Sequence, residues 1–405
     1  MKRIGFLAFS WIFSSMVFAQ TVRQQYTAVV TRPDSIQIPF RFEQVREQNK
    51  IRWYILNASE RLLVDDFQQE GDSLLVQMPF FESAFKLFIH KDGKMRGRWM
   101  KKTAAEPFSL PFEAKPLQTQ APALKNNASI QGRWRVSFQR SNGTWRPSVG
   151  MFNQQDNRVT GTFLNPSGDY RYLEGFVQNG RLQLACFDGS HAYLFTAKLQ
   201  NDTTITDGIF YSGLAGKENW KATKDPKASL PDAPVVFAMK PGESKLNFRF
   251  PSIDGDTVSL SDARFRNKPV IIQIMGSWCP NCMDETAMLS KFYKEYRNKG
   301  VEVLALAYEY STDFERSRKS IDRFRKRFDV QYPMLVTGVT VTDEKRAEKT
   351  LPQLTGIHYF PSTIFVGKDG TVRYLHQGYA GPATGKEHEA FMTDFYRKVQ
   401  TLLAE

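Results

Sequence analysis

The feature that most constrains this chain is the run 278–282, which reads Trp-Cys-Pro-Asn-Cys. The unbroken apolar run Val270–Met275 before it predicts a buried strand, and apolar residues at helical spacing over 283–298 predict a helix after it. Two thiols separated by two residues in the first turn of a helix lie close enough to form a disulfide without movement of the backbone. The order strand, Cys-x-x-Cys, helix therefore predicts a redox-active dithiol.

The two cysteines of this run are expected to have different roles. The N-terminus of a helix presents free N–H groups and a partial positive charge, which favour the thiolate form of Cys279. Pro280 suits an early helical position because its missing N–H is not needed there, and Cys282 is shielded in the first turn. We therefore expect Cys279 to attack a substrate disulfide and Cys282 to resolve the mixed disulfide.

Half of a zinc site, or a disulfide with a purely structural role, is the alternative for this cysteine pair. A zinc site needs two further ligands, and the only other cysteine, Cys186, lies in a distant β-rich region. The five histidines are also far apart in the sequence. We therefore expect no metal, and no cofactor besides the Cys279–Cys282 disulfide itself. Cys186 lies in an alternating strand and is expected to be a buried small hydrophobic residue.

From residue 240 onward, buried strands alternate with amphipathic helices, which predicts an α/β sandwich around a mixed sheet. This segment resembles the thioredoxin superfamily, and most closely its exported TlpA/ResA-like thiol–disulfide oxidoreductases. The resemblance rests on the stretch 248–282, FRFPSIDGDTVSLSDARFRNKPVIIQIMGSWCPNC, and on the insert 345–355, which fits an additional helix of that branch. It covers residues 240–405 and leaves the β-rich half of the chain untouched.

The resemblance implies a role for Glu285, three residues after Cys282, where ResA-like members keep a carboxylate below the disulfide. A part-buried carboxylate can accept and return the proton that Cys282 loses when it attacks the mixed disulfide. Gln273, which cannot ionise, occupies the position of the buried aspartate of thioredoxin, so Glu285 is the remaining candidate for this role. The alternative is an ordinary surface glutamate in the first turn of the helix.

A second match is Pro361, which corresponds to the cis-proline of the family and directly precedes a predicted strand. A cis bond there would turn the backbone of Phe360 toward the disulfide, where it could pair with an extended substrate segment. The alternative is a trans proline that opens an edge strand. Trp278 is expected to pack beside the disulfide and to report its redox state.

Two departures from the family pattern leave the direction of electron flow open. Pro280 and Asn281 stand where thioredoxin has Gly-Pro, and this dipeptide tunes the redox potential in the family. Phe360 is bulky for the residue before the cis-proline. A disulfide reductase, an oxidase and an isomerase would all use the same residues. A peroxiredoxin is less expected, because Cys279 lacks the upstream Pro and Thr that activate a peroxidatic thiol.

The first residues have the pattern of an export signal. Lys2 and Arg3 are followed by an apolar stretch over 4–18, and cleavage is expected after Ala19. An uncleaved membrane anchor is the alternative, although this stretch is short for a spanning helix of about 20 residues. Residues 1–19 are thus predicted to be a signal peptide. The mature protein is predicted to be exported, and to be periplasmic or in the cell envelope if the source is bacterial.

Residues 20–220 show short alternating apolar runs and turn residues, which are typical of strands. Two pairs of stretches match at a nearly constant offset: 55–59 with 163–167, and 81–88 with 187–195. This match predicts a duplicated all-β region, as two packed sheets or one barrel. The expected bounds are 20–103 for the first copy, 104–129 for a proline-containing linker, 130–220 for the second copy and 221–239 for a linker to the α/β domain.

The formal net charge of +13 raises the question of nucleic acid or anionic lipid as partners. The densest basic run lies in the helix predicted over 313–328. There Ile321, Phe324 and Phe328 recur at spacings of three and four, which predicts one apolar stripe on an otherwise basic helix. A solvated helix face is favoured over a binding surface. Export also makes nucleic acid an unexpected partner.

Two classes of function fit this sequence. The first is an exported thiol–disulfide oxidoreductase, in particular a reductase of protein disulfides. A membrane-linked electron donor would re-reduce it, because the chain has no nucleotide-binding glycine motif. The second is a binding protein, in which the β-rich half holds a ligand, glycan or envelope partner and the redox domain is auxiliary. A combination is also open, in which the β-rich half selects or positions substrates.

Overall fold

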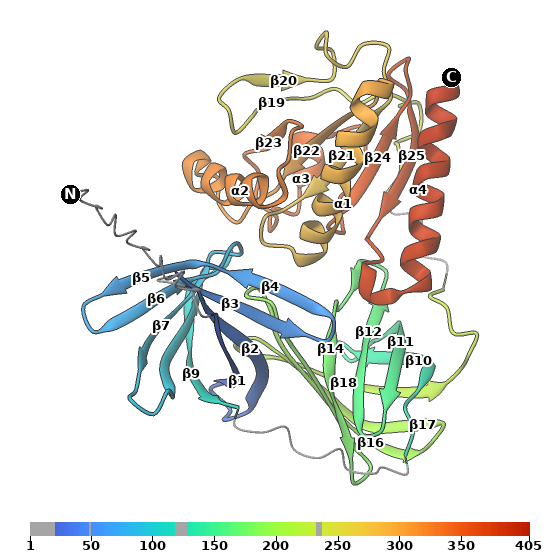
Figure 1. Ribbon diagram of the computed structural model, residues 1–405. Coiled ribbons are helices and arrows are strands. Elements are labelled where there is room, and N and C mark those ends of the chain that lie inside the picture. Colours follow the sequence, from blue (N-terminus) through green and yellow to red (C-terminus); the bar gives the residue numbers. More distant parts are fainter. Residues whose placement is uncertain (1–20, 48–49, 118–127, 232–236) are drawn as a thin grey trace, which may run out of the picture.

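The structure is a computed structural model that describes residues 21–47, 50–117, 128–231 and 237–405. Two β-rich units and an α/β domain follow one another along the chain (Figure 1). The predicted signal peptide, residues 1–19, lies outside the described residues. Over the described part of the chain, no helix is long and apolar enough to cross a membrane.

The first unit, here called barrel 1, is one antiparallel sheet of nine strands. Its strands are β1 (Val22–Thr31), β2 (Gln37–Glu47), β3 (Lys50–Asn57), β4 (Glu60–Val64), β5 (Asp66–Glu70), β6 (Ser73–Gln77), β7 (Ser83–Ile89), β8 (Met95–Lys101) and β9 (Phe108–Pro116). Strands that follow one another pair in order, and β1 also pairs with β9, so the sheet curls round on itself. The sheet stays open between β4 and β5, which are its two edges.

The second unit, barrel 2, is also antiparallel and closes completely. Its strands are β10 (Gly132–Gln139), β11 (Trp145–Gln155), β12 (Arg158–Asn165), β13 (Gly168–Asp169), β14 (Leu173–Gln178), β15 (Arg181–Phe187), β16 (Ala192–Asn201), β17 (Thr204–Ser212) and β18 (Gly216–Lys224). A pairing between β11 and β12 joins the two ends of the sheet. The short strand β13 flanks β12 at one end of the ring.

The pairing order of barrel 2 repeats that of barrel 1, with β10 in the place of β1 and β18 in the place of β9. The stretches that match in sequence occupy equivalent places. Residues 55–59 and 163–167 cover the ends of β3 and β12 and the turns after them. Residues 81–88 and 187–195 cover the entries into β7 and β16. This agreement supports the predicted duplication and gives its form as two barrel-like sheets.

The predicted linker over 104–129 is wrong in its first part, because strand β9 lies inside it and pairs with both β1 and β8. The prolines of this segment resemble linker composition. In the structure, Pro116 is the last residue of the segment that pairs with β1 and Pro111 directly precedes that segment, so neither missing N–H lies in its middle. The second linker also begins later than residue 221, since β18 continues to Lys224.

Aromatic side chains fill the interiors of both barrels. In barrel 1, the ring of Phe85 lies 4.7 Å from that of Phe112 and 6.2 Å from that of Trp53. In barrel 2, Phe163 and Phe195 lie 4.7 Å apart. All five side chains are fully buried, and such rings contribute strongly to a core because each buries a large apolar area. The barrels are therefore packed cores.

The C-terminal domain has a five-stranded mixed sheet in the order β23-β22-β21-β24-β25. Its elements are the hairpin β19 (Arg249–Pro251) and β20 (Thr257–Ser259), then β21 (Val270–Met275), α1 (Pro280–Tyr296), η1 (Arg297–Lys299), β22 (Glu302–Ala307), α2 (Phe314–Phe328), β23 (Met334–Val336), α3 (Arg346–Thr350), β24 (Ser362–Val366), β25 (Val372–Gln377), η2 (Pro382–Thr384) and α4 (Lys386–Ala404). The predicted fold class, an all-β region followed by a thioredoxin-like domain, is confirmed.

Two layers cover this sheet, as expected for strands that are apolar on both faces. One face of β21 and β22 shares a core with α1, α2 and α4, through side chains such as Phe292 and Phe395. The opposite face packs against α3 and the segment before the hairpin, through Leu351 and Phe248. This sandwich places the carboxyl end of β21 beside the N-terminus of α1, where the two cysteines lie.

Packed aromatic rings join the units into one molecule. Phe187 of barrel 2 inserts into the core of barrel 1, where its ring stacks 4.3 Å from Phe40 and lies 5.1 Å from Trp99. The basic helix α2 contacts barrel 1 through its predicted apolar stripe, and the ring of Phe324 lies 5.4 Å from that of Phe80. The predicted stripe on α2 is therefore an interdomain contact.

Candidate active site

The dithiol lies in the loop that leads from β21 into α1. Cys279 is the N-cap residue of α1, and its sulfur accepts the backbone N–H of Cys282 at 3.3 Å. Pro280 is the first residue of the helix, as the sequence predicts. A donated N–H and the helix N-terminus both stabilise negative charge on the Cys279 sulfur. This geometry suits Cys279 as the attacking thiol.

The two thiols differ in their exposure. Cys279 is 6% exposed and Cys282 is fully buried. Burial, and next the neighbouring Cys279 sulfur, raise the pKa of Cys282 well above its usual value. Cys282 therefore needs a nearby base to take its proton before it can attack. Cys279, in contrast, lines a pocket and is the thiol that a substrate can reach.

Glu285 lies in the interior beside the dithiol. Its side chain is fully buried, and it accepts hydrogen bonds from Thr363 Oγ1 at 2.6 Å and from Gln273 Nε2 at 2.9 Å. Burial raises its pKa to about 7, although both hydrogen bonds act in the opposite direction. The alternative of an exposed glutamate in the first helical turn is wrong, because α1 begins at Pro280 and turns Glu285 toward the sheet.

The loop before β24 faces the attacking sulfur. The Phe360–Pro361 peptide bond is cis. The Cys279 thiol donates to the carbonyl oxygen of Phe360 at 3.5 Å. Trp278 donates its Nε1 hydrogen to the carbonyl of Tyr308 at 2.8 Å, and its ring lies 5.4 Å from that of Phe360. The structure thus brings Trp278, Phe360 and Pro361 together around Cys279.

A second buried carboxyl group supports the loop before Cys279. Glu309, at the end of β22, accepts the Ser277 N–H at 2.8 Å and the Ser277 hydroxyl at 2.6 Å. Burial raises the pKa of Glu309 to about 7. The sequence analysis did not identify this residue, because nothing in its local pattern distinguishes it from a surface glutamate after a strand.

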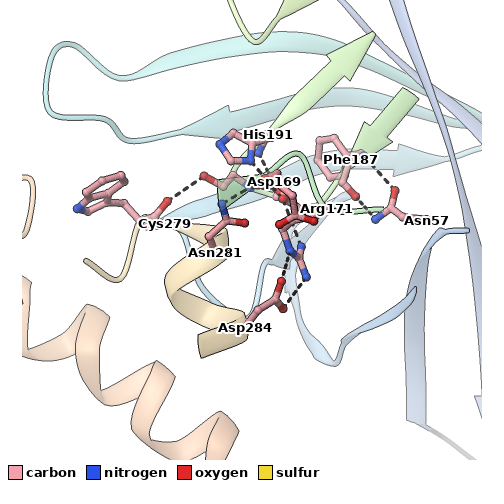
Figure 2. Close-up of polar contacts among 12 residues, drawn as sticks. Asn57, Asp169, Arg171, Phe187, His191, Cys279, Asn281 and Asp284 are labelled. Atoms are coloured by element: carbon pink, nitrogen blue, oxygen red, sulfur yellow. Dashed lines mark hydrogen bonds and ion pairs between the residues drawn. The ribbon is translucent and has the colours of Figure 1, made fainter. Parts of the chain in front are cut away.

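Barrel 2 contacts the dithiol loop directly, as Figure 2 shows. The Ser190 hydroxyl donates to the carbonyl oxygen of Trp278 at 3.0 Å, and Asn281 Nδ2 donates to the carbonyl of Asp169 at 3.1 Å. Gly168 lies so close that a Cβ there would come 2.2 Å from Asn281 Nδ2. Asn281, predicted to tune the redox potential, therefore also binds the second barrel.

Arg171 joins all three units at one buried point (Figure 2). Its guanidinium contacts Asp284 of α1 at 2.8 Å, Glu60 of barrel 1 at 2.5 Å and Asp188 of barrel 2 at 3.5 Å. The Arg171 side chain is only 3% exposed. Its backbone is left-handed, with φ of +56°. This residue fixes barrel 2 against the helix that carries Cys282.

The loop between β15 and β16, residues 188–191, is held in place by hydrogen bonds from barrel 1. The Asn57 side chain exchanges two hydrogen bonds with the backbone of Phe187, at 2.9 and 3.1 Å. The Ser83 hydroxyl donates to the Gly189 carbonyl at 2.7 Å, and Lys101 Nζ to the Ser190 carbonyl at 2.5 Å. Burial lowers the pKa of Lys101 to about 8. Barrel 1 thus positions the loop that contacts Trp278.

Asp169 is a buried and His191 a partly buried titratable group of barrel 2 near the dithiol. His191 Nδ1 lies 3.3 Å from Asp188 Oδ2, and desolvation lowers the pKa of the imidazole. Burial, and next the carboxylate of Asp284, raise the pKa of Asp169 to about 7. No sequence pattern pointed to these residues, since they approach the cysteines only through the packing of separate units.

These contacts enclose a pocket of about 330 Å³ over Cys279. Barrel 2 and the dithiol loop both line it, with side chains that include Arg146, Tyr170, His191, Trp278, Cys279 and Asn281. A larger cavity of about 1140 Å³ lies between the barrels, and none of the predicted site residues lines it. Cys279 thus lines the smaller pocket and not the larger cavity.

Metal-ligand geometry is not formed by the described residues, among which no cluster of three or more His, Cys, Asp or Glu side chains could hold an ion. Cys186 is 1% exposed in β15, in the core of barrel 2. Its predicted place as a buried small residue is confirmed.

The sheet order, the dithiol at the N-terminus of α1 and the loop of Phe360 and Pro361 define a thioredoxin-like thiol–disulfide oxidoreductase domain. The sequence of this domain matches a model of the AhpC/TSA family over residues 241–375. It also matches the thiol-disulfide oxidoreductase ResA of Halalkalibacterium halodurans, with 26% identity over 138 residues, 34% of this chain and 68% of that protein. The C-terminal domain is a TlpA/ResA-like domain of the thioredoxin superfamily.

Two further matches have similar extent. The thioredoxin-like protein YneN of Bacillus subtilis is 26% identical over 148 residues, which are 36% of this chain and 76% of that protein. A solved thiol-disulfide oxidoreductase from Bacteroides fragilis has 24% identity and a TM-score of 0.28, and the match covers 36% of this chain and 99% of that one.

Proposed function

We propose that this protein is an exported disulfide reductase in which Cys279 attacks, Cys282 resolves and Glu285 carries the proton between the two steps. The observation that carries the proposal is the pairing of two buried groups. Cys282 is fully buried with a raised pKa, and Glu285, also fully buried, has a pKa of about 7. A base with a pKa near the working pH is suited to proton transfer.

The proposed reaction has two exchange steps. The Cys279 thiolate attacks one sulfur of a substrate disulfide, which forms a mixed disulfide and releases the first substrate thiolate. Cys282 then loses its proton to Glu285 and attacks the Cys279 sulfur, which closes the Cys279–Cys282 disulfide and releases the second thiolate. The substrate gains two electrons, and the two released thiolates take up protons from Glu285 and from solvent.

The oxidised enzyme must then receive two electrons from outside the chain. We propose a membrane-linked dithiol donor, because the predicted export signal would place the protein beyond soluble nucleotide cofactors. The export signal predicted over 1–19 is the support for a periplasmic or envelope location.

The direction of electron flow is tested by the equilibrium reduction potential of Cys279–Cys282. Trp278 lies beside the pair and serves as a fluorescent reporter in thiol buffers, and Cys186→Ser removes the third thiol as a control. A potential near or below about −220 mV supports a reductase. A potential near about −120 mV would contradict the proposal and indicate an oxidase or isomerase. The absence of any reversible transition would exclude redox function.

The role of Glu285 is tested by Glu285→Gln, which keeps the shape and removes the ionisable group. In the wild type, the rate of the resolving step should rise with pH through about 7 and then level off, as Glu285 loses its proton. We expect the variant to be slower by about 10²- to 10⁴-fold at pH 7 and to lack this inflection. Stopped-flow Trp278 fluorescence measures the step.

The matched control is Glu309→Gln, which changes another buried carboxyl group of similar pKa that bonds to Ser277 rather than lying beside Cys282. It should keep the inflection near pH 7. If the inflection disappears in Glu309→Gln and persists in Glu285→Gln, Glu285 is not the proton carrier and the proposed mechanism is contradicted.

A further inference from the structure

The surroundings of Cys279 restrict what can reach it. The pocket over the sulfur has a volume of about 330 Å³ and is lined from two sides: by Cys279 and Asn281 of the C-terminal domain, and by Ser167, Tyr170 and His191 of barrel 2. Ligand pockets in proteins run from about 300 to about 1,000 Å³. The pocket is therefore at the small end of sites for small molecules.

The surface beside the dithiol, which a folded partner protein would need, is already occupied. Barrel 2 binds the carbonyl of Trp278 through Ser190 and the side chain of Asn281 through the backbone of Asp169. A specific interface between folded proteins buries about 800 Å² on each partner. Because barrel 2 already binds both of these sites, the surface that flanks Cys279 on the barrel 2 side is not available to a partner protein.

The part of barrel 2 that lines the pocket is held to the other two units by buried ion pairs. Arg171 lies in the same segment of barrel 2 and is paired with Asp284 of α1 and Glu60 of barrel 1. To swing barrel 2 away would expose or separate a buried ion pair, which is strongly unfavourable because it leaves uncompensated buried charges. The pocket is therefore part of the resting structure.

The charges of the residues that line the pocket contribute little to the selection of substrates. Three arginines line the pocket: Arg146 is paired with Glu218 at 2.7 Å, Arg171 is paired with Asp284 at 2.8 Å, and Arg140 is exposed. The Arg146 guanidinium also donates to Asn165 at 2.6 Å and to the Tyr170 hydroxyl at 2.7 Å. Desolvation lowers the pKa of His191, which disfavours a positive charge on its ring. Apart from the exposed Arg140, recognition at this site consequently depends mainly on shape.

We infer that barrel 2 is the substrate filter of the dithiol, and that the enzyme reduces disulfides carried on a slender, flexible support rather than on the surface of a folded protein. This inference rests on the proposed function and narrows its substrate class. The shared chemistry is a disulfide sulfur with little bulk around it. Such a sulfur occurs in low-mass disulfides and in unstructured peptide segments.

The test compares three disulfides with the full-length mature protein. They are 2-hydroxyethyl disulfide, an unstructured peptide with one internal disulfide, and a folded protein with one solvent-exposed disulfide of similar reduction potential. We expect kcat/KM for one or both of the first two to exceed that for the folded protein by at least about 100-fold, corresponding to about 2.7 kcal/mol. Fast reduction of 2-hydroxyethyl disulfide alone would identify low-mass disulfides as the substrates. Fast reduction of both would show that flexible peptide disulfides are also substrates.

Equal rates for the folded protein and the peptide would overturn the inference. A reversible Cys279–Cys282 transition in the same preparation shows that the redox function itself is intact, so this failure is distinct from failure of the proposed reductase.

A pocket-filling variant provides a second test. Ser167 lies in the turn between β12 and β13 and lines the pocket. Ser167→Trp should lower kcat/KM for 2-hydroxyethyl disulfide by at least about 10-fold, while the reduction potential should be the same in the variant and the wild type. An unchanged rate in Ser167→Trp, with the fold and potential preserved, would contradict entry through this pocket.

Discussion

Barrel 1 and barrel 2 have the same strand order but close differently, and the difference lies in one strand. In barrel 1, β4 has five residues and pairs with β3, so β5 has no access to β3 and the sheet stays open. In barrel 2, the equivalent β13 has two residues, so β14 pairs directly with β12 and the ring closes. Shortening one strand therefore converts an open sheet into a closed barrel.

The shortened strand also frees the segment that contacts the active site. The chain leaves the sheet directly after Asp169, the last residue of β13, so that the Asp169 carbonyl binds Asn281 and Arg171 contacts Asp284 of α1. In barrel 1 the corresponding residues remain paired within β4. A duplicated scaffold thus supplies one copy that supports the structure and one copy that approaches the dithiol.

The loops that enter β7 and β16 diverge in a parallel way. In barrel 1, Glu82 pairs with Arg316 of α2 at 2.7 Å, and both side chains keep some exposure. In barrel 2, Asp188 is 1% exposed and pairs with Arg171 and His191. One loop makes a surface contact with the C-terminal domain, and the other belongs to the buried junction beside the pocket. The variants below test whether this division holds.

Replacement of Arg171 should have the largest effect on stability. Arg171→Met leaves Glu60, Asp188 and Asp284 without their shared cation in a buried site, and loss of one partner of a buried ion pair costs about 3–5 kcal/mol. The matched variant Arg41→Met removes an interbarrel pair with Glu174 that is partly exposed, and should cost about 1 kcal/mol or less.

Chemical denaturation of both Arg171→Met and Arg41→Met, followed by tryptophan fluorescence, measures the two free energies of unfolding. Equal losses of unfolding free energy would mean that the buried ion pairs of Arg171 stabilise the protein no more than the partly exposed pair of Arg41 and Glu174.

Loss of the Phe187 ring should destabilise the protein nearly as much. Phe187→Ala empties a site in the core of barrel 1 that stacks on Phe40, and burial of this kind is worth about 3–5 kcal/mol. Phe81, its counterpart in barrel 1, has a left-handed backbone with φ of +70° and a ring 6.3 Å from Phe324. Phe81→Ala should cost less, because its ring has fewer close partners. The same measurement gives the free energy of unfolding of both variants. A larger loss for Phe81→Ala would mean that Phe81, and not Phe187, contributes more to stability.

The sequence predicted the redox domain well because its information is local. The apolar run Val270–Met275 coincides with β21, and Cys279 caps α1 where the strand-to-helix pattern placed it. Glu285 could be singled out only through resemblance, since its burial depends on how α1 packs on the sheet. For the same reason, local spacing could suggest the duplication but not the closure of barrel 2.

The junction between the units could not be predicted from the sequence. Ser190, Asp169 and Arg171 are ordinary loop residues in their local patterns, and they become site residues only because barrel 2 packs against α1. The error at β9 has a related cause. Its prolines favour a linker in isolation, whereas pairing on both sides makes the segment a strand.

The buried carboxyl of Asp169 should make stability depend on pH. Its pKa is about 7 in the folded protein and about 3.9 in an unfolded chain. The folded state therefore holds an extra proton between these values, and the free energy of unfolding should fall as pH rises from about 4 to about 7. At about 1.4 kcal/mol per pKa unit, the loss is at most about 4 kcal/mol.

Asp169→Asn should remove this part of the pH dependence. The variant should match the wild type near pH 4 and be more stable at pH 8, while the backbone carbonyl that binds Asn281 is unchanged. Urea denaturation at pH 4, 6 and 8 measures the difference. A variant that is less stable than the wild type at pH 8 would show that the ionised carboxylate contributes favourably at the junction.

The smallest effect is expected for Glu82→Gln, at the position in barrel 1 that corresponds to Asp188. The variant removes the ion pair with Arg316, whose side chain is 35% exposed, so water and salt already screen the attraction. We expect a loss of about 1 kcal/mol or less, which should shrink further in 1 M salt because the screening length falls to about 3 Å. Redox kinetics should stay unchanged, since the Glu82 carboxylate bonds to Arg316 of α2 and not to the dithiol loop. If Glu82→Gln instead slowed disulfide reduction, the contact between barrel 1 and α2 would also control the dithiol, and the two copies would not divide their roles as their exposure indicates.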